Sequence, residues 1–199
     1  MIKKSPLGST PIEDITGLIP THVTTKADLN ELEFANINKA IKKYFLGKLS
    51  DKKAPFDVSW LIKAHYEMYG EVWKWAGKFR TTELNIGVPP HQIHEQVKQL
   101  IDNFWYWEKT TKMEILEKTA RLHHGLVKIH PFKNGNGRWA RLITNIYLRK
   151  KSKPLIDWPE ATLQANSPFR KKYIQALQKA DQGSYNDLIQ LHVDLQAKE

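Results

Sequence analysis

Apolar residues recur every three or four positions along most of the chain, which is the pattern of helices that bury one face. In the first such segment, which starts at Asp28 and closes at Gly47, the repeat is carried by Phe34, Ile37 and Ile41. The later helices are predicted at 58–76, 91–107, 112–129, from about 136 onward, 167–180 and 185–197. Seven helical segments joined by short connections predict an all-α fold, built as a compact helical bundle.

One stretch departs from this pattern. The sequence KFRTTELNIGVPP, residues 78–90, lacks helical periodicity and lies between Gly77 and a cluster of Gly and Pro. These features predict a small β-hairpin, the only strand candidate that we find. An exposed hairpin edge could accept an extended segment of a partner protein, or the hairpin could be purely structural and pack against the helices.

The chain divides by composition at about residue 55. Residues 1–25 are rich in Pro, Gly and Thr and predict an extended arm, and the polar segment 48–55 follows the first helix. We therefore expect an N-terminal arm with the first helix over 1–55 and the main domain over 56–199.

The formal net charge of +10 and the isoelectric point of about 9.6 favour a polyanionic or nucleotide partner. The lysines are scattered in ones and twos, however, so a dedicated nucleic-acid surface is the less favoured interpretation. Without cysteine, disulfides and thiolate chemistry are excluded. No apolar leader follows the N-terminal lysines and no run is long enough to cross a bilayer, so we expect no membrane partner and a cytoplasmic location.

The strongest local signal is HPFKNGNGR, residues 130–138. Pro131 disfavours helical geometry at His130, so a helix should end there, and a new helix should begin near Asn136 after a glycine-rich loop. A helix start with glycines is suited to binding phosphate, and Arg138 and Arg141 extend one face of that helix. Taken singly, the histidine could be a helix cap and the loop an ordinary turn.

The whole motif HPFKNGNGRWAR resembles the signature of the Fic family, in which His-Pro-Phe is followed by Gly-Asn-Gly-Arg and a second arginine three residues later. ARLHHGLVKI before the motif, WKWAGKFR before the hairpin and FRKKYIQALQKAD near the C-terminus are also similar to the family. GLIPTHVTTKADLNELEFANI resembles the branch called mobile mystery protein B. The resemblance implies a compact helical Fic catalytic domain over 56–199, with the hairpin as a target-binding flap.

Most Fic proteins transfer AMP from ATP to a hydroxyl group of a target protein, with Mg²⁺, so the resemblance implies a protein adenylyltransferase. His130 would be the general base that deprotonates a Ser, Thr or Tyr side chain, and Phe132 would bury itself and fix the loop. The catalytic and nucleotide-binding residues implied are His130, Phe132, Gly135, Asn136, Gly137, Arg138 and Arg141. Thr82, Glu83, Leu84 and Asn85 would form the flap.

One motif position departs from the family pattern. Asn134 stands where the family usually has an acidic Mg²⁺ ligand. An amide oxygen can coordinate Mg²⁺ without contributing charge, so Asn134 is the metal candidate and weak Mg²⁺ binding is expected. The alternative function is a nucleotide-binding, toxin–antitoxin-like interaction protein with little or no transferase activity, and an antitoxin partner is therefore possible.

Many Fic proteins carry an inhibitory helix whose glutamate pairs with the second motif arginine. LNELEFAN matches this helix only in outline, because Leu29 and Phe34 replace the expected flanking residues. Glu33 is the candidate inhibitory residue, with Arg141 as its expected partner. The favoured interpretation is that Glu31 and Glu33 face solvent.

Overall fold

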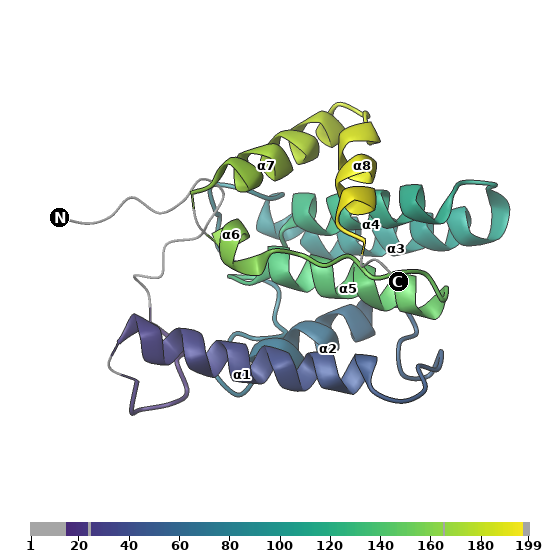
Figure 1. The fold of residues 1–199 in the computed structure, drawn as a ribbon. Helices are drawn as coiled ribbons and strands as arrows, with labels where there is room; N and C mark the ends of the chain where they lie inside the picture. The colour runs from purple at the N-terminus through teal and green to yellow at the C-terminus, as the bar shows by residue number, and fades with distance from the viewer. Residues whose placement is uncertain (1–14, 24, 165, 197–199) are drawn as a thin grey trace.

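The computed structural model describes residues 15–23, 25–164 and 166–196, and these are mostly helical (Figure 1). The elements are α1 (Lys26–Phe45), α2 (Val58–Tyr69), the short 3₁₀ helix η1 (Pro90–Gln92), α3 (Ile93–Thr110), α4 (Ile115–Ile129), α5 (Asn136–Lys150), α6 (Glu160–Gln164), α7 (Pro168–Asp181) and α8 (Asn186–Asp194). Over these ranges the only β pairing is two isolated bridges, Leu18 with Trp73 and Ile156 with Gln196. The prediction of an all-α fold is confirmed, although α6 was not predicted. Most of the predicted N-terminal arm lies outside the described residues.

Local sequence explains where several helices begin. Thr25 caps α1 through a reciprocal pair of hydrogen bonds with Asp28, and Asp57 accepts a hydrogen bond from the backbone at Trp60 to cap α2. Ser167 caps α7 in the same way, with Pro168 at the first helical position. These caps satisfy backbone N–H groups that a helix start leaves unpaired.

The second helix is shorter than predicted, because α2 ends at Tyr69 instead of continuing to residue 76. From Gly70 the chain runs through turns that stack Trp73 on Trp75, with ring centroids 5.1 Å apart. The backbone at Val72 accepts a hydrogen bond from the amide of Ile19. Tertiary pairing with the N-terminal segment therefore ends a helix that the apolar periodicity would extend.

The predicted β-hairpin is wrong, since residues 78–89 form a loop of bends that contains no strand. The Arg80 guanidinium lies inside this loop and donates hydrogen bonds to the carbonyl oxygens of Thr82 and Val88. Those are carbonyl groups that a hairpin would need for cross-strand pairing. A buried arginine closes the loop in place of a ladder.

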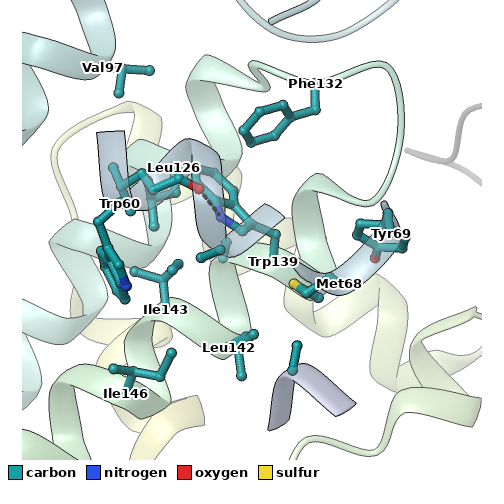
Figure 2. Close-up of a cluster of buried hydrophobic side chains, with 14 of the residues drawn as sticks. Trp60, Met68, Tyr69, Val97, Leu126, Phe132, Trp139, Leu142, Ile143 and Ile146 are labelled. Carbon is teal, nitrogen blue, oxygen red and sulfur yellow. Dashed lines mark hydrogen bonds between the residues drawn. The ribbon is translucent and has the colours of Figure 1, made fainter. Parts of the chain in front are cut away.

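The helices form one bundle around α4 and α5, with α1 and α2 on one side and α7 and α8 on the other (Figure 1). Trp139, Ile143 and Ile146 of α5 are completely buried and lie in the main apolar cluster (Figure 2). The Trp139 indole N–H donates to the carbonyl oxygen of Leu61 in α2, at 3.1 Å. This core holds the start of α5 rigidly against α2. No helix in the described part of the chain combines the length and apolar character needed to span a membrane.

The face of α1 that is buried is not the face that its apolar repeat predicted. Phe34 and Ile41 are 66% and 38% exposed, whereas Glu33 and Asn36 are buried. Asn36 donates to the carbonyl oxygen of Glu67 and accepts from the amide of Glu71, so it fastens α1 to the end of α2. The preference for a solvent-facing Glu33 is therefore wrong.

Two histidines form a buried contact between α4 and α8. His123 Nδ1 lies 3.0 Å from His192 Nε2, and His123 Nε2 lies 3.0 Å from the Tyr173 hydroxyl of α7. Burial lowers the pKa of His192 to about 3 and lowers that of His123 well below its ordinary value. Both rings are therefore neutral in the folded protein near pH 7, and the pair can share only one proton along the line between them.

We expect acid to destabilise the protein through this pair. Between the unfolded pKa of about 6.5 and the lower folded values, the unfolded chain binds protons that the folded chain does not, so stability falls as pH drops below about 6.5. Each buried histidine contributes at most about 1.4 kcal/mol per pH unit to this slope. Urea unfolding from pH 7.5 to 5 measures it, and His192→Gln, which retains a hydrogen-bonding group without the titration, should show a shallower slope than wild type. An unchanged slope in this variant would contradict the assignment.

Candidate functional site

His130 occupies the point where α4 ends. Its backbone is left-handed, with φ of 50° and ψ of 59°, and its amide caps the helix by donating to the carbonyl oxygen of Leu126. The residue is 8% exposed, and its buried Nδ1 makes no hydrogen bond to the described residues. Burial lowers the pKa of His130 to about 4. The backbone of Val127 acts to raise this pKa, and the positive charge of Arg80 acts to lower it further. The helix end predicted from Pro131 is confirmed, and the imidazole is a neutral proton acceptor at pH 7.

The loop 78–89 fixes the backbone of His130. Arg80 Nε donates to the His130 carbonyl oxygen at 2.8 Å, and the Arg80 amide donates to the carbonyl oxygen of Pro131 at 2.9 Å. Gly87 passes close enough that a Cβ atom there would lie 2.7 Å from the Cβ atom of His130. Any larger residue at Gly87, where φ is +99°, would therefore displace the histidine or the loop.

Phe132 anchors the loop between α4 and α5 in the core, and its burial agrees with what the family resemblance implied. Its side chain is completely buried, stacks on His65 with centroids 3.6 Å apart and meets Trp139 edge-on at 4.9 Å. Burying a phenylalanine contributes about 1.5–3 kcal/mol. This packing fixes the position of Phe132 and therefore the start of the glycine-rich segment that follows it.

Asn136 closes the same loop on itself. Its side-chain oxygen accepts from the Phe132 amide at 2.9 Å, and its side-chain nitrogen donates to the Phe132 carbonyl oxygen at 2.8 Å. Asn136 is 1% exposed, and both polar atoms of its side chain are used within the loop. Asn145, two and a half turns further along α5, makes the same two hydrogen bonds with the backbone of Ile156, at 2.9 Å each.

The start of α5 has the geometry of an anion-binding site. Gly135 is the N-cap in a left-handed conformation, with φ of 78°, and a Cβ atom there would lie 2.6 Å from the Tyr69 ring. A Cβ atom at Gly137 would lie 3.2 Å from Arg141 Nη1. The first amides of α5 have no acceptor within the helix and lie at the positive end of its dipole, and Arg138 and Arg141 are on its first two turns.

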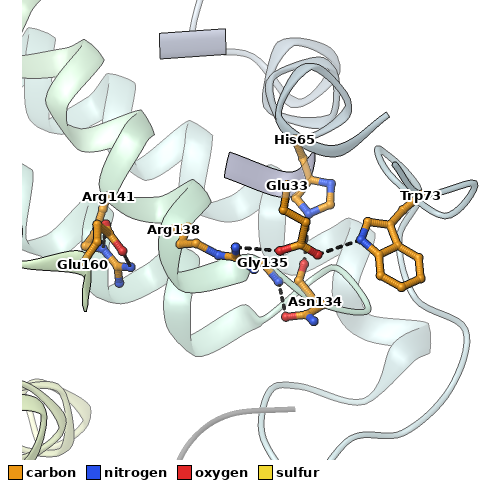
Figure 3. A network of polar contacts seen from close by, with 8 residues as sticks. All are labelled: Glu33, His65, Trp73, Asn134, Gly135, Arg138, Arg141 and Glu160. Atoms are coloured by element: carbon orange, nitrogen blue, oxygen red, sulfur yellow. Dashed lines mark hydrogen bonds and ion pairs between the residues drawn. The ribbon is translucent and has the colours of Figure 1, made fainter. Parts of the chain in front are cut away.

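The side chain of Asn134, the candidate metal ligand, forms a hydrogen bond within the loop between α4 and α5. Its side-chain oxygen accepts a hydrogen bond from the amide of Gly135 at 2.6 Å (Figure 3). No group of three or more His, Cys, Asp or Glu side chains able to hold a metal is found within the described ranges. One neutral oxygen does not build a Mg²⁺ site, because protein sites for this ion usually combine one or two carboxylates with phosphate oxygens and water.

Arg138, which is partly exposed, forms an ion pair with the buried Glu33 of α1 (Figure 3). Arg138 Nη1 lies 2.8 Å from Glu33 Oε2, while Glu33 Oε1 accepts from the indole N–H of Trp73 at 2.7 Å. The Arg138 guanidinium also lies 5.1 Å from the centre of the Tyr69 ring. The expected pairing of Glu33 with Arg141 is therefore wrong: Glu33 contacts the first motif arginine, because the buried face of α1 meets the first turn of α5.

Arg141 is held by Glu160 of α6 instead. Two hydrogen bonds join them, at 2.7 Å from Nε and 2.5 Å from Nη2. Arg141 is buried and lies 5.8 Å from the centre of the Trp158 ring. Both arginines that the sequence assigned to phosphate binding are thus paired with carboxylates, from α1 and from α6 (Figure 3).

The four predicted flap residues, 82–85, lie on the exposed loop beside His130 and form no edge strand. Next to them is an open depression of about 470 Å³, lined by Arg80, Thr81, Glu83, Pro90 and His91. Only Glu83 belongs to both sets. The loop can contact a partner through its side chains. It has no edge strand to which an extended segment of a partner could pair.

Sequence reasoning missed Arg80 and Glu160 as parts of this site. Arg80 lies within the segment KFRTTELNIG, but nothing in its spacing distinguishes a buried arginine from a surface charge. Glu160 follows Pro159 in a short segment whose helix is only five residues long. A burial signal from an alignment of relatives is what could have revealed either residue.

A model of the Fic/DOC family matches residues 55–148. Among curated proteins, the chain is 33% identical over 121 residues to protein adenylyltransferase fic-1 of Caenorhabditis briggsae, covering 57% of this chain and 22% of that protein. It is 30% identical over 167 residues to protein adenylyltransferase Fic of Nematostella vectensis, covering 77% of this chain and 38% of that protein. The chain thus spans well under half the length of these curated relatives.

Solved structures share the fold. Fic-1 of C. elegans superposes with a TM-score of 0.69 at 23% identity, over 90% of this chain and 52% of that one. BepC of Bartonella tribocorum, solved with bound AMPPNP, gives 0.66 at 18% identity, over 95% of this chain and all of that one.

The two asparagines of α5 offer a matched test of the loop. Asn136→Asp and Asn145→Asp each keep the acceptor and replace the donor with an oxygen facing a carbonyl group, so each should lower stability by about 1–3 kcal/mol. Only Asn136→Asp should also weaken the binding of inorganic pyrophosphate, because only Asn136 shapes the start of α5. Urea unfolding and calorimetric titration measure the two effects, and equal anion binding by both variants would contradict the assignment.

Proposed function

The chain belongs to the Fic/DOC family, and we propose that it is a protein adenylyltransferase, which transfers AMP from ATP to a Ser, Thr or Tyr hydroxyl of a target protein. The observation that carries the proposal is a neutral, buried His130 immediately before a glycine-led loop and helix start that present N–H groups to an anion. In this proposal residues 56–199 are the catalytic domain, and residues 1–55 supply the arm and α1.

In the proposed reaction His130 takes the proton of the target hydroxyl while the oxygen attacks the α-phosphorus of ATP. One P–O bond forms to the target, the bond to the bridging oxygen breaks, and pyrophosphate leaves. A pKa of about 4 makes His130 a weak base in the free protein, but the negative phosphates of bound ATP would raise it toward neutrality. The amides of Gly135, Asn136 and Gly137, with Arg138 and Arg141, would stabilise the charge that develops on the phosphates.

ATP as the substrate is supported by the AMPPNP held in the BepC structure of the same fold. Mg²⁺ would have to be held mainly by the phosphates of ATP, with Asn134 as a neutral ligand after its side chain leaves the Gly135 amide. Metal bound to the phosphates would neutralise part of their charge.

The target protein would contact the loop that contains Thr82, Glu83, Leu84 and Asn85, since this loop lies beside His130. Three of these four residues are exposed. A cytoplasmic location and an antitoxin partner belong to the proposal as well, the second only through the resemblance to mobile mystery protein B.

A second candidate function is nucleotide binding without transfer, in a toxin–antitoxin-like interaction protein. The neutral Asn134 favours it, because a weak metal site would slow phosphoryl chemistry more than it would weaken binding. A nucleic-acid-binding role has less support, since the motif arginines are occupied by carboxylates and the other basic residues are scattered.

Transfer of label from α-³²P-ATP to proteins of a bacterial lysate, and to the protein itself, tests the proposed activity with Mg²⁺ or Mn²⁺. His130→Ala should lower transfer by about 100-fold or more, because it removes the general base. Asn134→Asp should raise transfer by supplying a charged metal ligand.

If wild type and Asn134→Asp bind nucleotide but neither transfers label, the result contradicts the transferase proposal and supports the second candidate function. Salt-sensitive DNA binding that persists in a His130→Ala, Arg138→Ala double variant, with no nucleotide bound, would favour the nucleic-acid interpretation instead.

We further propose that Glu33 restrains the site by holding Arg138. Glu33→Gln keeps an acceptor for Trp73 but removes the charge, so ATP should bind about tenfold more tightly, because phosphate no longer competes with a buried carboxylate. Glu31→Gln, an exposed change on the same helix, is the control. Calorimetric titration with ATP measures both, and an affinity for Glu33→Gln no better than that of Glu31→Gln would reject the restraint.

A further inference from the structure

His65 is a buried polar residue to which the proposed reaction assigns no role. It lies on α2 and has no exposed surface, yet both ring nitrogens are hydrogen-bonded to backbone atoms of other segments. His65 Nδ1 accepts from the amide of Gly77 at 3.0 Å, and His65 Nε2 lies 3.0 Å from the carbonyl oxygen of Asn134. The ring thus connects Gly77, just before the loop 78–89, to Asn134 in the loop between α4 and α5.

These two partners determine which nitrogen carries the proton. A backbone amide can only donate, so Nδ1 must be the unprotonated acceptor, and a carbonyl oxygen can only accept, so Nε2 must carry the hydrogen. This arrangement requires a neutral imidazole, in agreement with a pKa that burial lowers to about 3. His65 is therefore a fixed donor aimed at the Asn134 carbonyl group over the whole physiological pH range.

The carbonyl of Asn134 and the amide of Gly135 belong to one rigid trans peptide group, in which the C=O and N–H bonds point in opposite directions. Because His65 holds the oxygen toward α2, the Gly135 N–H group must point the other way. On that side lies the Asn134 side-chain oxygen, 2.6 Å from the Gly135 nitrogen (Figure 3). This oxygen accepts the Gly135 hydrogen bond that a phosphate oxygen would accept in its place.

We propose that His65 is a positioning residue that orients the 134–135 peptide group so that the Gly135 amide donates to a nucleotide phosphate. Stacking of its ring on Phe132, nearly parallel at 15°, holds the donor in place beside the loop. The inference rests on the proposed function for the identity of the anion. The orientation of the peptide group itself does not depend on that function.

Two substitutions separate the hydrogen bonds of His65. His65→Gln places an amide N–H₂ group near the position of Nε2, so it can still donate to the Asn134 carbonyl oxygen. His65→Asn places an amide oxygen near the position of Nδ1, so it can still accept from Gly77 but cannot reach Asn134. Both variants lose the ring and its stacking, which makes them matched for packing. Ile101→Val, which removes one buried methyl group from α3, controls for a general loss of stability.

The first measurement is a crystal structure of His65→Asn without nucleotide. The expected result is a rotated 134–135 peptide group whose carbonyl oxygen no longer faces α2. A peptide group in its original orientation would overturn the proposal, whatever the protein's activity.

The second measurement is calorimetric titration with ADP, which reports phosphate binding without transfer. His65→Asn should bind ADP about 10- to 100-fold more weakly than wild type, the effect of losing one hydrogen bond to a charged group. His65→Gln and Ile101→Val should remain within about threefold. Equal weakening in His65→Asn and His65→Gln would show a packing role only and overturn the positioning role. If wild type does not bind ADP, the proposed function fails, and the crystal structure alone decides the orientation.

Discussion

The candidate site depends on the direction in which the carbonyl groups of the loop 130–135 point. The oxygens of His130 and Pro131 accept from Arg80, and the oxygen of Phe132 accepts from the Asn136 side chain. The Asn134 oxygen lies against His65. In the 134–135 peptide group, trans geometry directs the Gly135 N–H bond away from the bound Asn134 oxygen, toward the side where the Asn134 side-chain oxygen lies. A loop with the same sequence and free carbonyl groups would present a mixed surface to an anion.

Holding the oxygens in this way requires polar donors in the core. Arg80, His65 and Asn136 are each at most 5% exposed, and a buried polar group without partners would destabilise the fold. Each is satisfied by backbone atoms, so the loop and its donors stabilise one another. Phe132 adds apolar packing at the centre of this network, between His65 and Trp139. The rigidity of the site and the stability of the α2–α5 contact thus come from the same interactions.

Sequence alone was sufficient for those features that local rules determine. The helix end at His130 follows from Pro131, and the new helix at Asn136 follows from the glycines before it. Apolar periodicity located most helices, but it extended α2 past Tyr69, because pairing of Val72 with Ile19 is a tertiary contact. The hairpin failed for a similar reason, since a single buried arginine, Arg80, can satisfy carbonyl groups that a strand pattern would assign to a ladder.

The acidic partners of the arginines could not be predicted, because they come from segments far away in the chain. Glu33 precedes Arg138 by 105 positions, and Glu160 follows Arg141 by 19. A family pattern pointed to Glu33 but to the wrong arginine, since the pairing depends on the rotation of α1, whose buried face carries Glu33 and Asn36 while Phe34 is exposed. Side-chain periodicity on α1 favoured the opposite rotation.

The two ion pairs differ in how readily an incoming polyphosphate could replace the carboxylate. The Glu33 side chain is 3% exposed and is also bonded to Trp73, so separating it from Arg138 leaves a buried charge without its partner. The Glu160 side chain is 43% exposed, and water and salt can stabilise it once it leaves Arg141. Under the proposed function Arg141 is therefore released at lower free-energy cost, and Arg138 dominates the barrier to nucleotide binding. Because Arg138 is tied to α1 and Arg141 to α6, a change in the packing of α1 would alter nucleotide affinity more than an equal change at α6.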